Sequence, residues 1–196
     1  MIVYFKIHMY TKRYKEEIIK LYTQSYNKQF YLREISKLTK LPLKTTQNLI
    51  AELEKENVLK SKIHGKNKYF SLNLDNIQTK FYLLKAEIDK TSYFLEKYPV
   101  FKTFLKEIKD NPLIIVFGSF LKLKADKSSD LDILTTAKFP LHLLPYKIHK
   151  VELSETSVKN AVKNQEALLK EIEENHVILS GHSLYLDIMW WNYAKT

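Results

Sequence analysis

The sequence predicts an α+β protein of two domains. The first half reads as three amphipathic helices followed by a hairpin, whereas the second holds a wholly apolar run, "LIIVF", and then an alternating one, "DLDILTT". Positive charge also gathers in the first half. We expect an N-terminal domain over residues 1–75, a linker or dimerisation helix over 76–98, and a domain over 99–196 that forms a mixed β-sheet with flanking helices.

The charge distribution separates the two halves. The whole chain has a net charge of +10. Residues 1–99 hold 19 lysines and arginines against 10 acidic residues, whereas residues 100–196 hold 13 against 12. The excess charge of the first half favours a polyanionic partner such as DNA, although a lysine-rich composition alone also produces such a balance.

The composition argues against several classes of protein. The chain has no cysteine, which excludes disulfides and thiolate zinc sites, and its six histidines do not form a metal-binding motif. No apolar run approaches the roughly 18 residues of a membrane span. The N-terminal "MIVYFKIHMY" is interrupted by Lys6 and His8 and does not resemble a signal peptide. We expect a cytoplasmic protein without a membrane partner.

The N-terminal half has a regular order of elements. Apolar residues recur at helical spacing in "RYKEEIIKLYTQSY", "FYLREISKLTKLP" and "LKTTQNLIAELEKENVL". "VLKSKIHGKNKYFSLNL" then places two strand-forming runs around a turn at Gly65. Residues 11–75 resemble a winged helix-turn-helix domain, with "REIS" similar to the second helix and "TTQNLIAELEKENVL" to the third. Asn57 stands where that family usually has glycine.

This resemblance implies contact with DNA, through a third helix in the major groove and a hairpin on the phosphate backbone. The implied contact residues are Lys44, Thr45, Thr46, Gln47 and Asn48 in the helix and Lys60, Lys62, Lys66 and Lys68 in the hairpin. The alternatives are a solvated hairpin or a module that binds protein.

The segment "NIQTKFYLLKAEIDKTSYFLEKYP" carries a heptad seam. The seam residues follow one another at alternating steps of four and three: Ile77, Phe81, Leu84, Ile88, Thr91, Leu95 and Tyr98. Such a helix either joins two copies of the chain or packs on its own domains. We expect the domain boundary near Tyr98, followed by a short helix between Pro99 and Pro112.

The stretch "VFGSFLKLKADKSSDLDIL" carries the strongest chemical signal. Asp130 and Asp132 lie two residues apart on an expected strand, so their carboxylates project from one face and repel each other unless a cation lies between them. Such hard oxygen ligands suit Mg²⁺ or Mn²⁺. Gly118 lets a phosphate approach the backbone, and Ser119 adds a hydroxyl. Lys122 and Lys124 can neutralise a triphosphate.

With this spacing, residues 100–185 resemble the DNA polymerase beta-like nucleotidyltransferase superfamily, in particular its minimal branch. The resemblance implies that Asp130 and Asp132 bind metal ions, that Gly118 and Ser119 hold phosphates, and that a nucleoside monophosphate moves from an NTP to an acceptor hydroxyl. The acceptor is open and includes a protein, since relatives of this branch resemble antitoxins that modify a toxin. The alternatives are a DNA-binding regulator that senses nucleotide without turnover and an antitoxin-like interaction module.

Active members of that superfamily add a third carboxylate on a neighbouring strand. Glu152 in "YKIHKVELSE" is the expected residue, but the alternation of the strand can instead place His149 there, and Asp187 is a later option. The chain also lacks the second glycine that the family often has before the aspartate pair.

The C-terminal segment predicts one long amphipathic helix after an N-cap at Ser154, then a strand, a turn at Gly181 and an aromatic tail. In that tail, Trp190 and Trp191 either pack in the core or at a dimer contact, or stack on a base.

Overall fold

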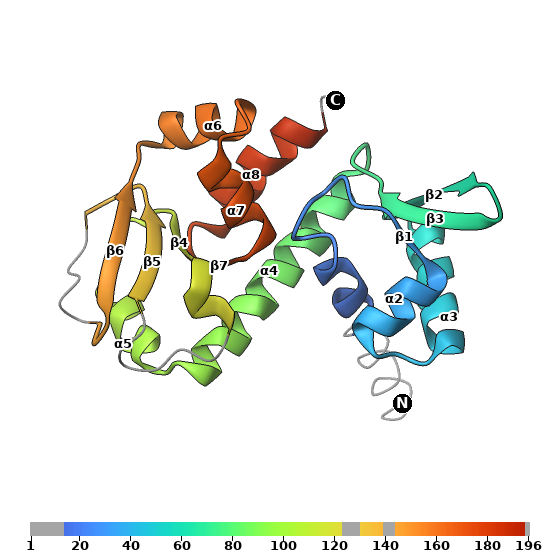
Figure 1. Cartoon of the computed structure of the whole chain (residues 1–196), viewed down its shortest axis with the longest axis horizontal. Coiled ribbons are helices and arrows are strands. Elements are labelled where there is room, and N and C mark those ends of the chain that lie inside the picture. The colour runs from blue at the N-terminus through green and yellow to red at the C-terminus, as the bar shows by residue number, and fades with distance from the viewer. Residues whose placement is uncertain (1–13, 123–129, 139–143, 195–196) are drawn as a thin grey trace. The chain divides into compact units, whose positions relative to one another are not determined.

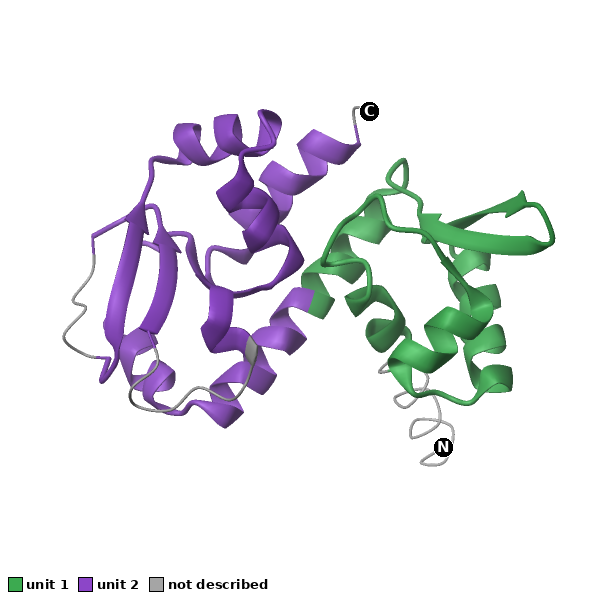
Figure 2. Cartoon of the chain, viewed as in Figure 1, with its two compact units in different colours: residues 1–86 green, residues 87–196 purple. Residues whose placement is uncertain are grey.

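The computed structural model describes residues 14–122, 130–138 and 144–194 (Figure 1). The chain divides into two compact units, residues 1–86 and residues 87–196, and the division falls inside one long helix, α4 (Ile77–Lys97) (Figure 2). Within the described residues, no helix combines the length and the apolar content that crossing a membrane requires.

Before α4, the described residues of the N-terminal unit form three helices followed by a hairpin, in the order that the sequence predicts. Residues 14–20 are helical. The elements that follow are β1 (Phe30–Tyr31), α2 (Leu32–Thr39), α3 (Leu43–Lys55), β2 (Leu59–His64) and β3 (Asn67–Leu72). The three strands form an antiparallel sheet in the order β1-β3-β2.

Apolar helix faces hold this unit together. Ile18, Ile35 and Leu53 are all fully buried. The hydroxyl of Tyr22 donates to the carbonyl of Phe70 at 3.0 Å and so ties the turn after the first helix to the sheet. Asn57 follows α3 with a φ of 55°, in the left-handed region that asparagine tolerates better than most residues.

The C-terminal unit is a four-stranded mixed sheet with flanking helices, as predicted. Its elements are α5 (Val100–Lys106), β4 (Ile114–Phe117), the 3₁₀ turn η1 (Gly118–Lys122), β5 (Asp130–Thr135), β6 (Lys147–Glu152), α6 (Glu155–Lys163), α7 (Ala167–Glu174), β7 (His176–Ser180) and α8 (His182–Tyr193). The strand order is β6-β5-β4-β7, in which β5 and β6 are parallel and β4 is antiparallel to both of its neighbours.

A cluster of aromatic rings forms the core on one face of this sheet. Phe94, Phe101 and Phe120 pack together with ring centroids 4.9 to 6.2 Å apart, in the range of favourable aromatic contacts. They lie in one buried cluster with Val116 of β4 and Ile133 of β5. The end of α4 therefore belongs to the core of the C-terminal unit.

This packing corrects the predicted linker over residues 76–98 and the boundary at Tyr98. The hydroxyl of Thr91 donates to the carbonyl of Ile178 at 2.5 Å, on the open side of the edge strand β7. Thr91 and Tyr98 are buried, whereas Ile77 and Phe81 at the start of the seam are 59% and 57% exposed. The complete heptad seam therefore cannot join two copies of the chain, because its second half is already covered.

A second correction concerns the long amphipathic helix predicted after Ser154. The N-cap is confirmed, since the Ser154 hydroxyl accepts from the backbone N–H of Ser157 at 3.0 Å. The helix is broken, however, into α6 and α7, and Gln165 between them has a φ of 55°. The aromatic tail is helical and forms α8.

A buried ionic cluster links α4 to β7. Glu87 has no exposed surface, and its carboxylate lies 2.9 Å from Nζ of Lys90 and 3.1 Å from Nε2 of His176. Burial raises the pKa of Glu87, but attraction to His176 and Lys90 and their hydrogen bonds outweigh it and lower the pKa to about 2. Glu87 is therefore ionised in the folded protein well below neutral pH.

We predict that Glu87→Gln lowers the free energy of unfolding of the C-terminal unit by about 3 kcal/mol at pH 7, because the carboxylate has a pKa of about 2 instead of 4.5. This stabilisation is complete above pH 4.5 and is lost as the pH falls toward 2, so the difference from wild type should shrink over that range. Urea unfolding followed by tryptophan fluorescence measures this difference in stability.

Glu96→Gln, at an exposed position of the same helix, is the control and should change stability by less than about 0.5 kcal/mol. Equal stability of the Glu87→Gln variant and wild type at pH 7 would contradict this account.

Candidate functional site

One end of the C-terminal sheet brings the predicted site residues together. Because β4 is antiparallel to β5 and β7, and β6 is parallel to β5, strand β4 ends where the other three strands begin. Gly118 directly follows β4, and Asp130 is the first residue of β5. Phe117, the last residue of β4, is paired with Asp132. The glycine turn and the aspartate pair are thus neighbours at this end of the sheet.

The aspartate pair lies on one face of β5, as the alternation predicts. Each carboxylate faces a residue of the neighbouring strand β6. Nζ of Lys147 lies 3.2 Å from Oδ1 of Asp130, and Nδ1 of His149 lies 3.2 Å from Oδ1 of Asp132. The side chains of Lys147 and His149 are 83% and 76% exposed, so both contacts are at the surface and are weak.

Gly118 is required by the geometry of the turn. It has a φ of 75°, in the left-handed region, and a Cβ at this position would lie 3.3 Å from Cγ of Asp132 and overlap its Oδ2. Only a residue without a side chain leaves this carboxylate in place. The next residue, Ser119, is exposed at the start of the 3₁₀ turn.

Asn175 holds the glycine turn from the other side, and the sequence reasoning did not identify it. Its side-chain amide donates to the carbonyl of Gly118 at 3.1 Å. Asn175 ends α7 and immediately precedes β7, at the same end of the sheet. The two residues are 57 positions apart in the sequence, so no local pattern connects them. The fold of the sheet brings them together.

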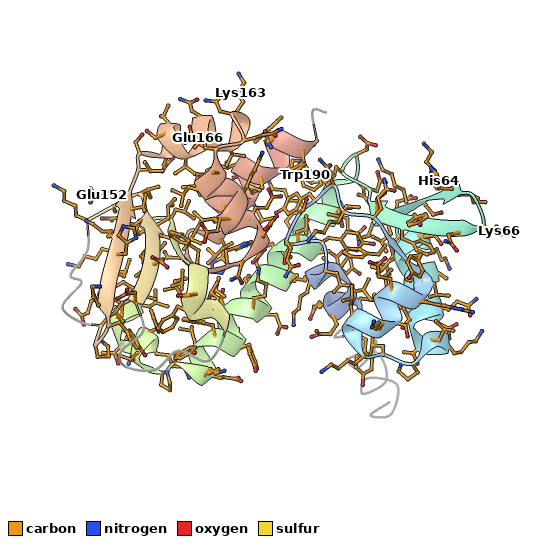
Figure 3. All side chains as sticks on the ribbon, viewed as in Figure 1. His64, Lys66, Glu152, Lys163, Glu166 and Trp190 are labelled. Carbon is orange, nitrogen blue, oxygen red and sulfur yellow. The ribbon has the colours of Figure 1, made fainter. Side chains whose placement is uncertain are left out.

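The structure contradicts the prediction that Glu152 supplies a third carboxylate. Strand β6 pairs in a register that sets His149 opposite Asp132 and Glu152 opposite Thr135. Glu152 therefore projects from the other face, at the far end of β6 (Figure 3). Nζ of Lys150 lies 2.6 Å from its carboxylate, and this hydrogen bond lowers the pKa of Glu152. Asp187 lies on α8 and not on this strand.

The remaining predicted phosphate ligands are not placed. Lys124 lies outside the described residues, and so does the side chain of Lys122. In the part of the chain that the structure describes, no three histidine, aspartate or glutamate side chains gather as a metal centre.

The donor set of this site nevertheless fits a magnesium ion. Mg²⁺ is commonly held by one or two carboxylates and completed by water and substrate phosphates, so Asp130 and Asp132 are sufficient protein ligands. The missing side chain at Gly118 leaves room for Oδ2 of Asp132, whose side chain is 24% exposed. The surface contacts of the two carboxylates with Lys147 and His149 are weak enough for a divalent ion to replace.

The predicted DNA contacts on α3 fall into two groups. Lys44, Gln47 and Asn48 are exposed, and Thr45 is half-buried. Thr46 has no exposed surface, and its hydroxyl donates to the carbonyl of Pro42 at 3.1 Å. The prediction for Thr46 is therefore wrong, because this side chain closes the first turn of the helix.

The four hairpin lysines do not form one surface. The strand register puts Lys60 and Lys62 on the outer face of the hairpin, whereas Lys68 shares the inner face with the buried Phe70. Lys66 lies in the turn at the hairpin tip (Figure 3). Nζ of Lys68 lies 2.9 Å from the carboxylate of Glu54, so this lysine ties the hairpin to α3.

Between α3 and the hairpin lies an open groove of about 790 Å³. Gln47 and Glu54 line its helical side, and Lys66 and Lys68 line its hairpin side. Arg33, from α2, adds a further exposed cation to this groove.

Comparison with known proteins agrees with the site in the C-terminal unit. Residues 99–195 match the family model described as "Nucleotidyltransferase domain". This match supports placing the C-terminal unit in the nucleotidyltransferase superfamily. The match includes the Gly118 turn and both aspartates, and it supports nucleotidyl transfer from an NTP in general. No curated protein and no solved structure matches the chain.

We predict that Gly118→Ala abolishes the stabilisation of this nucleotidyltransferase domain by ATP with Mn²⁺, because the new methyl group displaces the Asp132 carboxylate. A ligand at 100 times its Kd adds about 2.7 kcal/mol of stability, which a thermal shift detects. Gly65→Ala is the control. Gly65 also has a positive φ, but its added Cβ meets nothing within 4 Å, so this variant should lose about 1 kcal/mol and keep the ligand effect. A full thermal shift in Gly118→Ala would disprove the role of this turn.

Proposed function

We propose that the protein is a Mg²⁺-dependent nucleotidyltransferase that moves a nucleoside monophosphate from an NTP to an acceptor hydroxyl, whose identity is open and includes a protein such as a toxin partner. One observation carries this proposal: Asp130 and Asp132 project together from β5 beside a turn whose glycine makes room for the carboxylate of Asp132. The family match of residues 99–195 supports the same chemistry.

Asp130 and Asp132 are the residues that would hold the metal. When bound, Mg²⁺ supplies positive charge that stabilises the developing charge on the transferring phosphate and the leaving pyrophosphate. Lys147 lies beside Asp130, is largely exposed, and can turn toward a bound phosphate. We assign the backbone at Gly118 and the hydroxyl of Ser119 to the triphosphate, as the resemblance implies, and we expect Lys122 and Lys124 to contribute there.

In the transfer step, the acceptor oxygen forms a bond to the α-phosphorus, the bond to the bridging oxygen breaks, and pyrophosphate leaves with that electron pair. The hydroxyl proton needs an acceptor. His149, 3.2 Å from Asp132, occupies the strand position where a third carboxylate was predicted, and we propose it for that role. Asn175 acts indirectly, by holding the carbonyl of Gly118.

We predict that the double variant Asp130→Asn/Asp132→Asn loses transfer of label from α-labelled NTP to any acceptor in a cell lysate with Mg²⁺. Replacing both carboxylates by neutral amides should lower transfer by at least about 100-fold, because metal ions supply several kcal/mol to such reactions.

Glu152→Gln is the matched control for this experiment. It also removes one carboxylate from the same sheet, but on the opposite face, so transfer should stay within about twofold of wild type. Equal labelling by wild type and the double aspartate variant would refute the enzymatic proposal.

A second function, nucleotide sensing without catalysis, is favoured by one observation. The residues facing the aspartate pair from β6 are Lys147 and His149, and neither is a carboxylate. A chain that binds NTP through Asp130 and Asp132 but transfers no label would act as a nucleotide-responsive regulator. NTP-dependent thermal stabilisation without label transfer distinguishes this function from the first.

We further propose that the N-terminal unit is a winged helix-turn-helix domain that binds DNA. The order of its elements, the sheet order β1-β3-β2 and the exposed Lys44, Gln47 and Asn48 on α3 support this proposal. Its positive charge supports a contact with phosphates. Lys60, Lys62 and Lys66 remain free to contribute to such a contact, whereas Lys68 is paired with Glu54.

We predict that Lys44→Ala/Lys66→Ala weakens the binding of duplex DNA. In a plot of log affinity against log salt concentration, the slope should become less steep by about two, because two phosphate contacts are lost. A fluorescence anisotropy titration at several salt concentrations measures both effects. Lys102→Ala/Lys106→Ala is the control, because it removes the same charge from α5 in the other unit. Identical salt slopes for the two double variants would exclude α3 and the hairpin as the DNA contact.

A further inference from the structure

A groove between α6 and α8 of the C-terminal unit has no role in the proposed transfer. Its volume is about 850 Å³, within the range of sites for small ligands. Strands β5, β6 and β7 all run away from the aspartate pair, and α6 and α8 directly follow β6 and β7. The groove therefore lies at the opposite end of the sheet from Asp130, the first residue of β5; Figure 1 shows α6 beyond the end of β6.

One wall of the groove is an aromatic and aliphatic face of α8. Leu184, Ile188 and Trp191 follow at steps of four and three, so they share one side of the helix. The side chain of Trp191 is 61% exposed, whereas that of its neighbour Trp190 is 8% exposed. The sequence left both tryptophans open between a core and a stacking role. The structure places Trp190 in the core and Trp191 at the surface.

The opposite wall is cationic. Lys159 and Lys163 lie one turn apart on α6, both are exposed, and both line the groove. None of the ion pairs found among the described residues involves either ammonium group. Two like charges one helical turn apart repel each other, so an anion between them is favoured.

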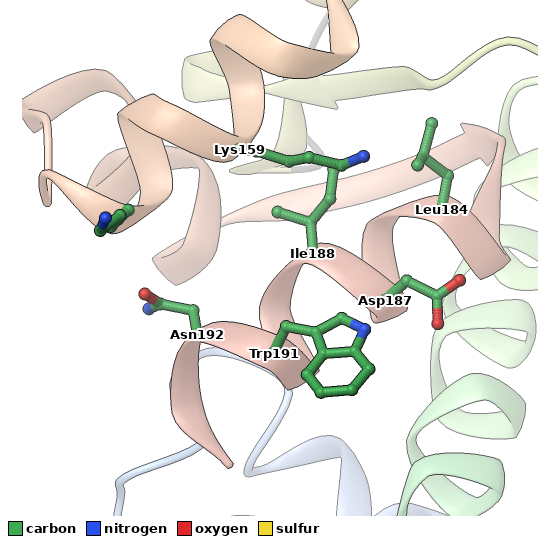
Figure 4. A pocket seen from close by; sticks show the side chains of 7 residues that line it. Lys159, Leu184, Asp187, Ile188, Trp191 and Asn192 are labelled. Atoms are coloured by element: carbon green, nitrogen blue, oxygen red, sulfur yellow. The ribbon is translucent and has the colours of Figure 1, made fainter. Parts of the chain in front are cut away.

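Polar side chains flank the indole on α8. Figure 4 shows Asp187 and Asn192 on either side of Trp191, with Lys159 reaching toward the same space from α6. An amide and a carboxylate beside an exposed aromatic ring suit the hydrogen-bonding edge of a base, while the ring stacks on its face. An acidic peptide would use the two lysines but would meet the repelling carboxylate of Asp187.

We propose that this groove binds a nucleoside phosphate, with the base stacked on Trp191 and the phosphate held by Lys159 and Lys163. The ligand is a free nucleotide or one residue of a single-stranded nucleic acid, since both offer the same base and phosphate. The site is separate from the aspartate pair and needs no divalent cation. It is therefore independent of the proposed transfer reaction.

Quenching of Trp191 fluorescence tests the proposal on the full-length protein in EDTA. AMP and a four-residue single-stranded oligodeoxynucleotide are the two probes, and ribose 5-phosphate is the control without a base. At least one of the first two probes should quench saturably, and ribose 5-phosphate should not. Tighter binding of the oligonucleotide would identify a nucleic-acid strand as the ligand, and tighter binding of AMP a free nucleotide.

Variants separate this groove from the other site. Binding followed by equilibrium dialysis should weaken about tenfold or more in Trp191→Ala and in Lys159→Ala/Lys163→Ala, because stacking and charge each contribute on that scale. Asp130→Asn/Asp132→Asn and Lys170→Ala, at an exposed position of α7, should bind as wild type. The proposal is overturned if neither probe binds in EDTA or if the groove variants bind normally. It is also overturned if the aspartate variant loses binding, or if polyglutamate, as an acidic peptide, is the only probe that binds the groove.

Discussion

The pairing of β5 with strands on both sides is the constraint on which the site depends. On the β4 side, it brings the carboxylate of Asp132 against Gly118, where no side chain fits. On the β6 side, it sets Lys147 opposite Asp130 and His149 opposite Asp132. A shift of β6 by one residue would exchange its two faces, so the chemistry beside the aspartates follows directly from this register.

The site is also held from outside the sheet. Asn175 donates to the carbonyl of Gly118, and the next residue, His176, belongs to the buried cluster with Glu87 on α4. Since α4 continues into the N-terminal unit, the helix that anchors this edge of the sheet is shared by both units. The nucleotidyltransferase match begins at residue 99, after the end of α4, although α4 supplies part of the core of this unit.

Local sequence patterns correctly predicted those features of the structure that depend only on residues close together in the sequence. The alternation of "DLDIL" predicted the shared face of the aspartates, and Ser154 predicted a helix start. The failures depend on contacts between distant segments. Glu152 has a suitable neighbourhood in sequence, but strand register turns it away, and Thr46 is polar but buried against Pro42. The boundary at Tyr98 failed because α4 packs beneath β7.

The central claim is that Asp130 and Asp132, beside the Gly118 turn, together bind a divalent cation with a nucleoside triphosphate. Anomalous diffraction from crystals grown with Mn²⁺ and a nonhydrolysable ATP analogue tests it most directly. The account predicts a manganese peak bridging the two carboxylates and the phosphates of the analogue. Ordered analogue elsewhere, or no manganese peak between these carboxylates, would contradict it.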